Sequence, residues 1–216
     1  MLKIENTIKP HTGETILYLG AELKNAKKAM IMIHGRGADA QSMSGLCEHF
    51  MHPDIIYIIP QATGFTWYPY RFIESRESNE PGISSALTLI NAIITALNNS
   101  GIAMNDIFLL GFSQGACLAL DYAARYPEKY AGIFCLSGGL IGKTIIPGDY
   151  NGDMKQTPVF LGCSDADFHI PEERVHQSAS IMESLNADVT VKIYPNLGHT
   201  INRDELEFIT TLLKIS

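Results

Sequence analysis

The chain has 216 residues, of which 46% are hydrophobic and 18% are charged, so it can form a compact core. This length favours one large domain, residues 1–216, over two small ones. Sixteen Lys and Arg against 23 Asp and Glu give a net charge of −7, which argues against a nucleic-acid partner. No stretch approaches the roughly 18 apolar residues that cross a bilayer, so we expect no integral membrane association and a cytoplasmic location.

The predicted elements begin with a candidate antiparallel edge strand over residues 15–19, after a more polar start. Short apolar runs rich in isoleucine then predict buried strands at 29–33, 55–59, 107–110, 133–136 and 159–161, and 189–194 is also strand-like. Between them, helical spacing or composition covers 83–97, 116–126 and 175–185. This alternation predicts an α/β fold, with a mostly parallel central sheet and helices on both faces, because parallel strands need crossover connections.

Two other features concern loops and cysteines. Residues 61–82 combine glycine, proline and aromatic residues without a helical period, and they follow a strand, where open α/β sheets bind ligands.

The cysteines have no close pair of the kind that holds zinc or forms a redox dithiol, so we expect buried free thiols and no metal site. They are Cys47, Cys117, Cys135 and Cys163.

The strongest motif is Gly111-Phe112-Ser113-Gln114-Gly115, which lies between a predicted strand and a predicted helix. A G-x-S-x-G turn in that setting holds the serine in a strained conformation, with its hydroxyl above the end of the sheet. Ser113 is therefore the candidate nucleophile. The alternative is that this segment is only a glycine-rich connection between a strand and a helix, without a catalytic role.

A serine nucleophile needs an imidazole to accept its proton, and in this type of turn the histidine comes last in the chain. His199 fits, because it lies in a loop between a strand-like run and a helix that Asn202 and Glu205 can cap. His176 is expected on the surface of a helix. His169 is expected at the rim of the pocket or on the surface.

A carboxylate usually orients the histidine, and in this type of turn it comes between the serine and the histidine in the sequence. Two aspartates follow the strand that starts at residue 159. Asp167 is favoured because it lies further beyond the strand. Asp165 can instead stabilise the loop through backbone hydrogen bonds.

An oxyanion hole in such a site uses the N–H of the residue after the nucleophile and one N–H after an early strand. These requirements select the backbone N–H groups of Gln114 and Arg36. The side chain of Arg36 faces either solvent or an acidic group of the substrate. His34, just before that turn, is expected to be structural.

The same turn offers an alternative of another class, a dinucleotide-binding oxidoreductase. Gly35-x-Gly37-x-x-Ala40 matches the G-x-G-x-x-G/A fingerprint, which also needs an acidic residue at the end of the next strand. That strand ends in Pro60-Gln61-Ala62, and the fingerprint leaves Ser113 and His199 unexplained.

Taken together, the motifs resemble the carboxylesterase/phospholipase group of α/β-hydrolases, relatives of the acyl-protein thioesterases and, more distantly, the dienelactone hydrolases. The resemblance extends from about residue 29 to the C-terminus. It implies an α/β-hydrolase fold without a separate cap domain, Asp167 as the acid because it stands four residues before Pro171, and oxyanion donors at Arg36 and Gln114. The motifs are His34-Gly35-Arg36-Gly37, Pro60-Gln61, Thr66-Trp67-Tyr68-Pro69, the Ser113 turn, Asp167-Phe168-His169-Ile170-Pro171 and Gly198-His199.

The chain departs from the acyl-protein thioesterases at Arg36 and at Tyr68-Pro69, and from the dienelactone hydrolases in having a serine nucleophile. The resemblance therefore favours a small carboxylesterase acting on short-acyl esters, with a thioesterase or lysophospholipase for longer acyl groups as the alternative. We expect the protein to bind a small ester and to need no cofactor. A homodimer is the one protein assembly that we consider. Trp67 is the candidate pocket wall, although it could equally be buried in the core.

Overall fold

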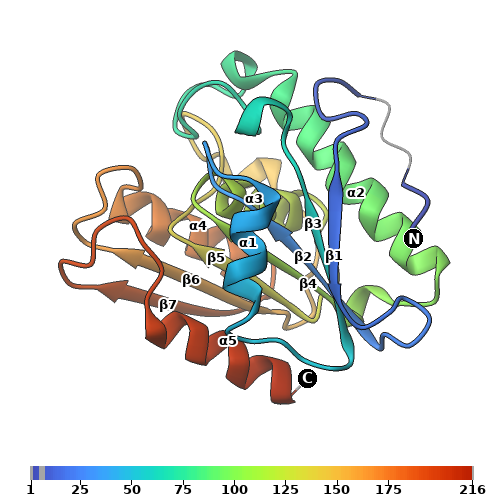
Figure 1. Cartoon of the computed structure of the whole chain (residues 1–216). Coiled ribbons are helices and arrows are strands. Elements are labelled where there is room, and N and C mark those ends of the chain that lie inside the picture. The colour runs from blue at the N-terminus through green and yellow to red at the C-terminus, as the bar shows by residue number, and fades with distance from the viewer. Residues whose placement is uncertain (1, 5–7, 216) are drawn as a thin grey trace.

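The computed structural model describes residues 2–4 and 8–215, in which seven strands form one sheet (Figure 1). The spatial order is β1-β3-β2-β4-β5-β6-β7. Edge strand β1 pairs antiparallel with β3, and every other pair is parallel, as the sequence predicted. The strands are β1 Ile16–Gly20, β2 Lys28–Ile33, β3 Ile55–Pro60, β4 Ile107–Phe112, β5 Gly132–Leu136, β6 Pro158–Ser164 and β7 Asp188–Tyr194.

Five α-helices cover the two faces of this sheet. Helices α1 and α5 pack on one face, and α2, α3 and α4 pack on the other (Figure 1). The predicted helices are therefore confirmed, and the α/β assignment with them. The helices are α1 Ala40–Cys47, α2 Gly82–Asn99, α3 Gln114–Arg125, α4 Glu172–Ser184 and α5 Arg203–Ile215.

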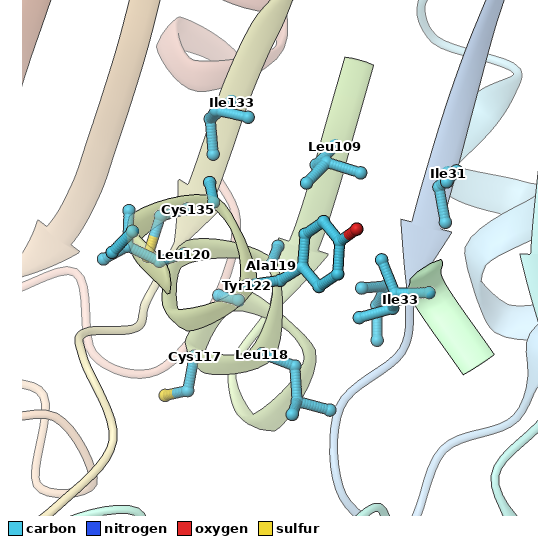
Figure 2. Packing of buried hydrophobic residues seen from close by; sticks show 14 of the residues in the cluster. Ile31, Ile33, Leu109, Cys117, Leu118, Ala119, Leu120, Tyr122, Ile133 and Cys135 are labelled. Atoms are coloured by element: carbon cyan, nitrogen blue, oxygen red, sulfur yellow. The ribbon is translucent and has the colours of Figure 1, made fainter. Parts of the chain in front are cut away.

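The core divides into two layers because successive strand residues point to opposite faces. Ile31 of β2 packs under α3, whereas Met30 and Met32 belong to the layer beneath α1 and α5. Figure 2 shows side chains of α3, including Tyr122, packed against the central strands. This packing fixes the start of α3 over the ends of β2 and β4.

The helices, the possible metal ligands and the cysteines can each be described for residues 2–4 and 8–215. None of the helices in ranges 2–4 and 8–215 combines the length and hydropathy needed to span a membrane. The same ranges contain no cluster of three metal-ligating side chains. All four cysteines are buried free thiols, as predicted.

Helix α5 is capped by the predicted pair. Asn202 Oδ1 accepts a hydrogen bond from the Glu205 N–H at 3.1 Å, and Glu205 Oε2 accepts one from the Asn202 N–H at 2.8 Å. The rest of the Glu205 carboxyl group is buried against β6, and its Oε1 atom has no hydrogen-bond partner in the described structure. Burial raises the pKa of Glu205 to about 7.

This buried carboxyl predicts a pH-dependent stability. An unfolded glutamate ionises near pH 4.5 and the folded one near 7, so the free energy of unfolding falls as pH rises between these values. Glu205→Gln keeps a capping oxygen but cannot ionise. In denaturant melts we expect it to match the parent near pH 4.5 and to exceed it by up to about 3 kcal/mol at pH 8. Glu207→Gln, an exposed change in α5, is the control, and parallel pH curves for Glu205→Gln and parent would contradict the argument.

Candidate active site

The turn between β4 and α3 holds Ser113 in an unfavourable backbone conformation. Its φ is 55° and its ψ is −117°, a region that L-residues rarely adopt. The Ser113 N–H donates to the Leu136 carbonyl at 2.9 Å, and its own carbonyl accepts from the Cys117 N–H at 3.0 Å. The turn is thereby fixed to both β5 and α3.

The two glycines of this turn permit an approach that no side chain would allow. A Cβ atom on Gly111 would lie 2.2 Å from the Gly115 carbonyl oxygen, and one on Gly115 would lie 2.0 Å from the Ile33 carbonyl oxygen. Both neighbours are backbone atoms and cannot swing away. The steric role that the sequence predicted for the glycines is therefore present.

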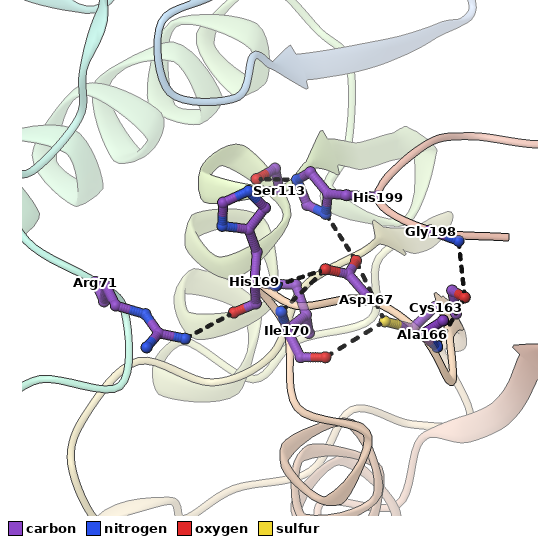
Figure 3. A network of polar contacts seen from close by, with 10 residues as sticks. Arg71, Ser113, Cys163, Ala166, Asp167, His169, Ile170, Gly198 and His199 are labelled. Carbon is purple, nitrogen blue, oxygen red and sulfur yellow. Dashed lines mark hydrogen bonds and ion pairs between the residues drawn. The ribbon is translucent and has the colours of Figure 1, made fainter. Parts of the chain in front are cut away.

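Ser113, His199 and Asp167 form a continuous hydrogen-bonded chain (Figure 3). His199 Nε2 lies 2.9 Å from Ser113 Oγ, and His199 Nδ1 lies 2.7 Å from Asp167 Oδ2. A carboxylate accepts only, so Nδ1 carries a proton and Nε2 is left to accept one from the hydroxyl. This is the arrangement that activates a serine.

The Asp167 carboxylate is buried and accepts several further hydrogen bonds. Its Oδ1 atom accepts from the N–H groups of His169 at 2.9 Å and Ile170 at 3.1 Å. The Cys163 thiol lies 3.8 Å from Oδ2. These contacts orient the second oxygen toward His199.

The loops after β6 and β7 are linked by two more hydrogen bonds. Asp165 Oδ1 accepts from the Asn196 N–H at 2.8 Å, which is the loop-stabilising role considered for it. Ser164 Oγ accepts from the Gly198 N–H at 3.0 Å. Sequence reasoning missed Ser164, and its position at the C-terminal end of a predicted strand was the available signal.

The two predicted oxyanion donors belong to the two segments that adjoin Ser113, namely the start of α3 and the turn after β2. Gln114 begins α3, where an N–H has no partner within the helix. Gly35, next to Arg36, approaches so closely that its added Cβ would lie 3.3 Å from Ser113 Cβ. Within the described residues, neither the Arg36 N–H nor the Gln114 N–H has an acceptor, so both are available to a ligand.

The Gln114 side chain has a second role that the sequence did not suggest. Its Oε1 accepts from the Trp67 N–H at 2.8 Å, and its Nε2 donates to the Tyr68 carbonyl at 2.8 Å. The long loop is thus fixed to the start of α3.

Trp67 is buried and is not part of the pocket lining, so its predicted role as a pocket wall is wrong. Its indole N–H donates to the His34 carbonyl at 2.9 Å, and its ring lies between His11 and His34. The alternative, an aromatic residue packed in the core, is correct. The hydrogen bond joins the indole to residue 34, two positions before Arg36.

His11 and His34 are structural and neutral, as predicted for His34. Burial lowers the pKa of both imidazoles. His34 Nδ1 donates to the Gly35 carbonyl at 2.8 Å and Nε2 accepts from the Ala62 N–H at 3.1 Å. His176 lies on the exposed face of α4, 3.3 Å from Glu172, also as predicted.

A pocket of about 270 Å³ opens beside Ser113. His169 lies at its edge, with its ring 4.7 Å from the ring of His199, so the prediction of a rim position is confirmed. The Arg36 guanidinium donates to the carbonyls of Pro69, at 2.8 Å, and Tyr70. The lining residues are Gly35, Arg36, Ala38, Tyr68, Arg71, Phe72, Phe112, Ser113, Gln114, Cys117, His169, Ile170 and His199.

Comparison with known proteins identifies the family. The family model described as phospholipase/carboxylesterase matches residues 18–216. The chain belongs to this phospholipase/carboxylesterase family. It is 30% identical to acyl-protein thioesterase 1 of Aspergillus fumigatus over 91% of each chain, and 28% identical to lysophospholipase-like protein 1 of Mus musculus over 83% of this chain and 82% of the relative.

A solved structure supports the same conclusion for the fold. The phospholipase/carboxylesterase of Dyadobacter fermentans is 40% identical and superposes with a TM-score of 0.91, covering 96% of this chain and all of the other. The α/β-hydrolase fold without a separate cap is therefore confirmed. The oxidoreductase alternative is not supported, because in this phospholipase/carboxylesterase member the Gly35–Gly37 turn faces Ser113.

The strained turn makes a prediction about stability. Ser113→Gly and Ser113→Ala both lose the hydroxyl group, but only glycine relieves the positive φ. Relief is worth about 1–3 kcal/mol, against about 0.5–1 kcal/mol for the extra entropy of an unfolded glycine. In thermal melts we expect Ser113→Gly to be the more stable variant by about 1 kcal/mol.

The matched control is Ser180, an exposed residue within α4. There the order should reverse, with the glycine variant about 1 kcal/mol less stable than the alanine variant. The same order at both positions would mean that the Ser113 turn stores no strain.

Proposed function

We propose that the protein is a serine carboxylesterase that hydrolyses small, short-acyl carboxylic esters through an acyl-enzyme intermediate. The observation that supports this most directly is the hydrogen-bonded chain from Ser113 through His199 to Asp167. Membership in a family of esterases and thioesterases supports the same reaction class.

In the first step, His199 Nε2 accepts the hydroxyl proton while Ser113 Oγ attacks the ester carbonyl. The negative charge that develops on the carbonyl oxygen is stabilised by the N–H groups of Arg36 and Gln114. Asp167 stabilises the imidazolium that forms. His199 then gives its proton to the departing alcohol, and the acyl group remains on Ser113.

In the second step, water replaces the alcohol. His199 accepts a proton from the water, whose oxygen attacks the acyl carbonyl, and the proton then returns to Ser113 Oγ as the carboxylic acid leaves. Every proton moves between the substrate, water, Ser113 and His199, while Asp167 stays ionised. The proposed reaction uses no cofactor.

The size of the pocket supports a short acyl group. A volume of about 270 Å³ is at or below the lower end of the roughly 300–1,000 Å³ of pockets that hold drug-sized ligands, which favours a small acyl group. Tyr68, Phe72 and Ile170 are buried pocket residues, so they limit its depth.

A thioesterase or lysophospholipase acting on longer acyl groups is the second candidate. It is supported by the names of the relatives and by a groove of about 560 Å³ that shares Arg36 and Arg71 with the pocket. A long chain could extend into that groove. The length of the preferred acyl group separates the two candidates.

A fluorophosphonate probe tests the proposed chemistry, because it labels activated serines. We expect one label on the parent and none on Ser113→Ala by intact-mass analysis. Asp167→Asn should lower kcat for a 4-nitrophenyl ester by about 10⁴, since it leaves the imidazole in the wrong tautomer.

Asp165→Asn is the matched control, two residues away on the same loop. It should keep substantial activity, because Asp165 contacts the backbone of Asn196 rather than His199. Equal labelling of the parent and Ser113→Ala would refute the nucleophile, and the reverse ranking of the two aspartates would transfer the acid role to Asp165.

The proposed acyl preference predicts a chain-length profile. For 4-nitrophenyl esters, kcat/KM should rise over the first few carbons and then level off, because further methylenes leave the pocket. Phe72→Ala should move the plateau to longer chains by deepening the pocket. Phe50→Ala removes a buried ring outside the pocket and should leave the profile unchanged. A parent profile that keeps rising through long chains would favour the second candidate.

A further inference from the structure

The pocket beside Ser113 contains two arginines without a carboxylate partner. Arg36 and Arg71 are both exposed and both line it, and neither has a carboxylate within ion-pair distance among the described residues. By contrast, Arg76 and Arg125 each pair with Asp121, at 2.8 and 3.0 Å. The pocket arginines are therefore uncompensated by the protein's own acids.

The lining of the pocket is cationic in a protein that is otherwise acidic. It contains two arginines and no aspartate or glutamate, although the whole chain has a net charge of −7. Glu74 lines the neighbouring groove and forms no ion pair with either arginine. The positive charge is thus concentrated beside Ser113, where it attracts anions.

Within the described residues, the two guanidinium groups are held in place by hydrogen bonds to backbone carbonyl groups and not by ion pairs with carboxylates. Arg36 donates to the carbonyls of Pro69 and Tyr70, and Arg71 Nη2 donates to the His169 carbonyl at 3.4 Å (Figure 3). A guanidinium has five N–H donors, so most donors of Arg71 remain available. Carbonyl anchoring orders the side chains without neutralising them.

We propose that the preferred substrates are esters that bear a second, anionic group, a carboxylate or a phosphate, which Arg71 binds with the assistance of Arg36. This inference rests on the proposed esterase function and names its substrate class. The planar guanidinium matches both anions through paired hydrogen bonds. Because both arginines line the pocket and the neighbouring groove, the anionic group of the substrate lies on the side of the pocket that borders the groove.

Three acetate esters of matched size test the proposal: 4-acetoxybenzoate, its uncharged methyl ester and 4-acetoxyphenyl phosphate. For the parent, kcat/KM should be about tenfold higher for at least one anionic ester than for the methyl ester, mainly through KM. Added salt should reduce this ratio. Arg71→Gln should bring the ratio close to one, and the two anions identify the preferred charge.

Lys27→Gln is the matched control, because it removes the same charge before β2, at the opposite end of the sheet from Ser113. It should keep the parent ratio. A ratio near one in the parent, or a ratio that Arg71→Gln and Lys27→Gln change equally, would overturn the anion site while leaving the esterase function intact.

Calorimetry separates the two proposals further. Ser113→Ala should bind intact 4-acetoxybenzoate more tightly than the Ser113→Ala, Arg71→Gln double variant does. If no ester is hydrolysed by the parent, the proposed function fails, and this difference in Kd then decides the anion site by itself. Equal Kd values would overturn it.

Discussion

The close backbone packing around Ser113 is the constraint on which the rest of the site depends. Gly115 packs on the Ile33 carbonyl and Gly111 on the Gly115 carbonyl, at separations that leave no room for a Cβ. This contact brings the end of β2 beside the start of α3. The turn that carries Arg36 and the start of α3 at Gln114 consequently both adjoin Ser113, although Arg36 and Gln114 are 78 positions apart in the sequence.

The other half of the site comes from two loops that follow adjacent parallel strands. Because the C-terminal ends of β6 and β7 meet at one edge of the sheet, short side chains suffice to join their loops. Ser164 and Asp165 bind backbone N–H groups of the second loop, and Asp167 binds the His199 ring. The imidazole is therefore held by a set of polar contacts around it as well as by its carboxylate partner.

The long loop after β3 forms the pocket through a buried polar network. The Trp67 indole donates to the His34 carbonyl just before the turn of Arg36, and the Gln114 side chain binds the loop backbone at Trp67 and Tyr68. Neutral histidines suit this network, because each ring donates one hydrogen bond and accepts another without the cost of a buried charge. The positive charges of Arg36 and Arg71, which form no ion pair among the described residues, therefore lie at the pocket, where a substrate can contact them.

The sequence by itself determined the order of elements and the residues with local signals. Periodicity gave the strands and helices, and the glycines around Ser113, together with the chain order, selected the serine and His199. Asp167 and Asp165 were separable only by position and resemblance until the contacts with His199 and Asn196 were seen. Only the tertiary structure decided that Trp67 is buried and that Arg71 faces the pocket, because those outcomes depend on partners such as His34 and His169 that are 33 and 98 positions away. Local patterns report backbone conformation and burial periodicity, whereas the direction of a loop side chain is set by the distant groups that it meets after folding.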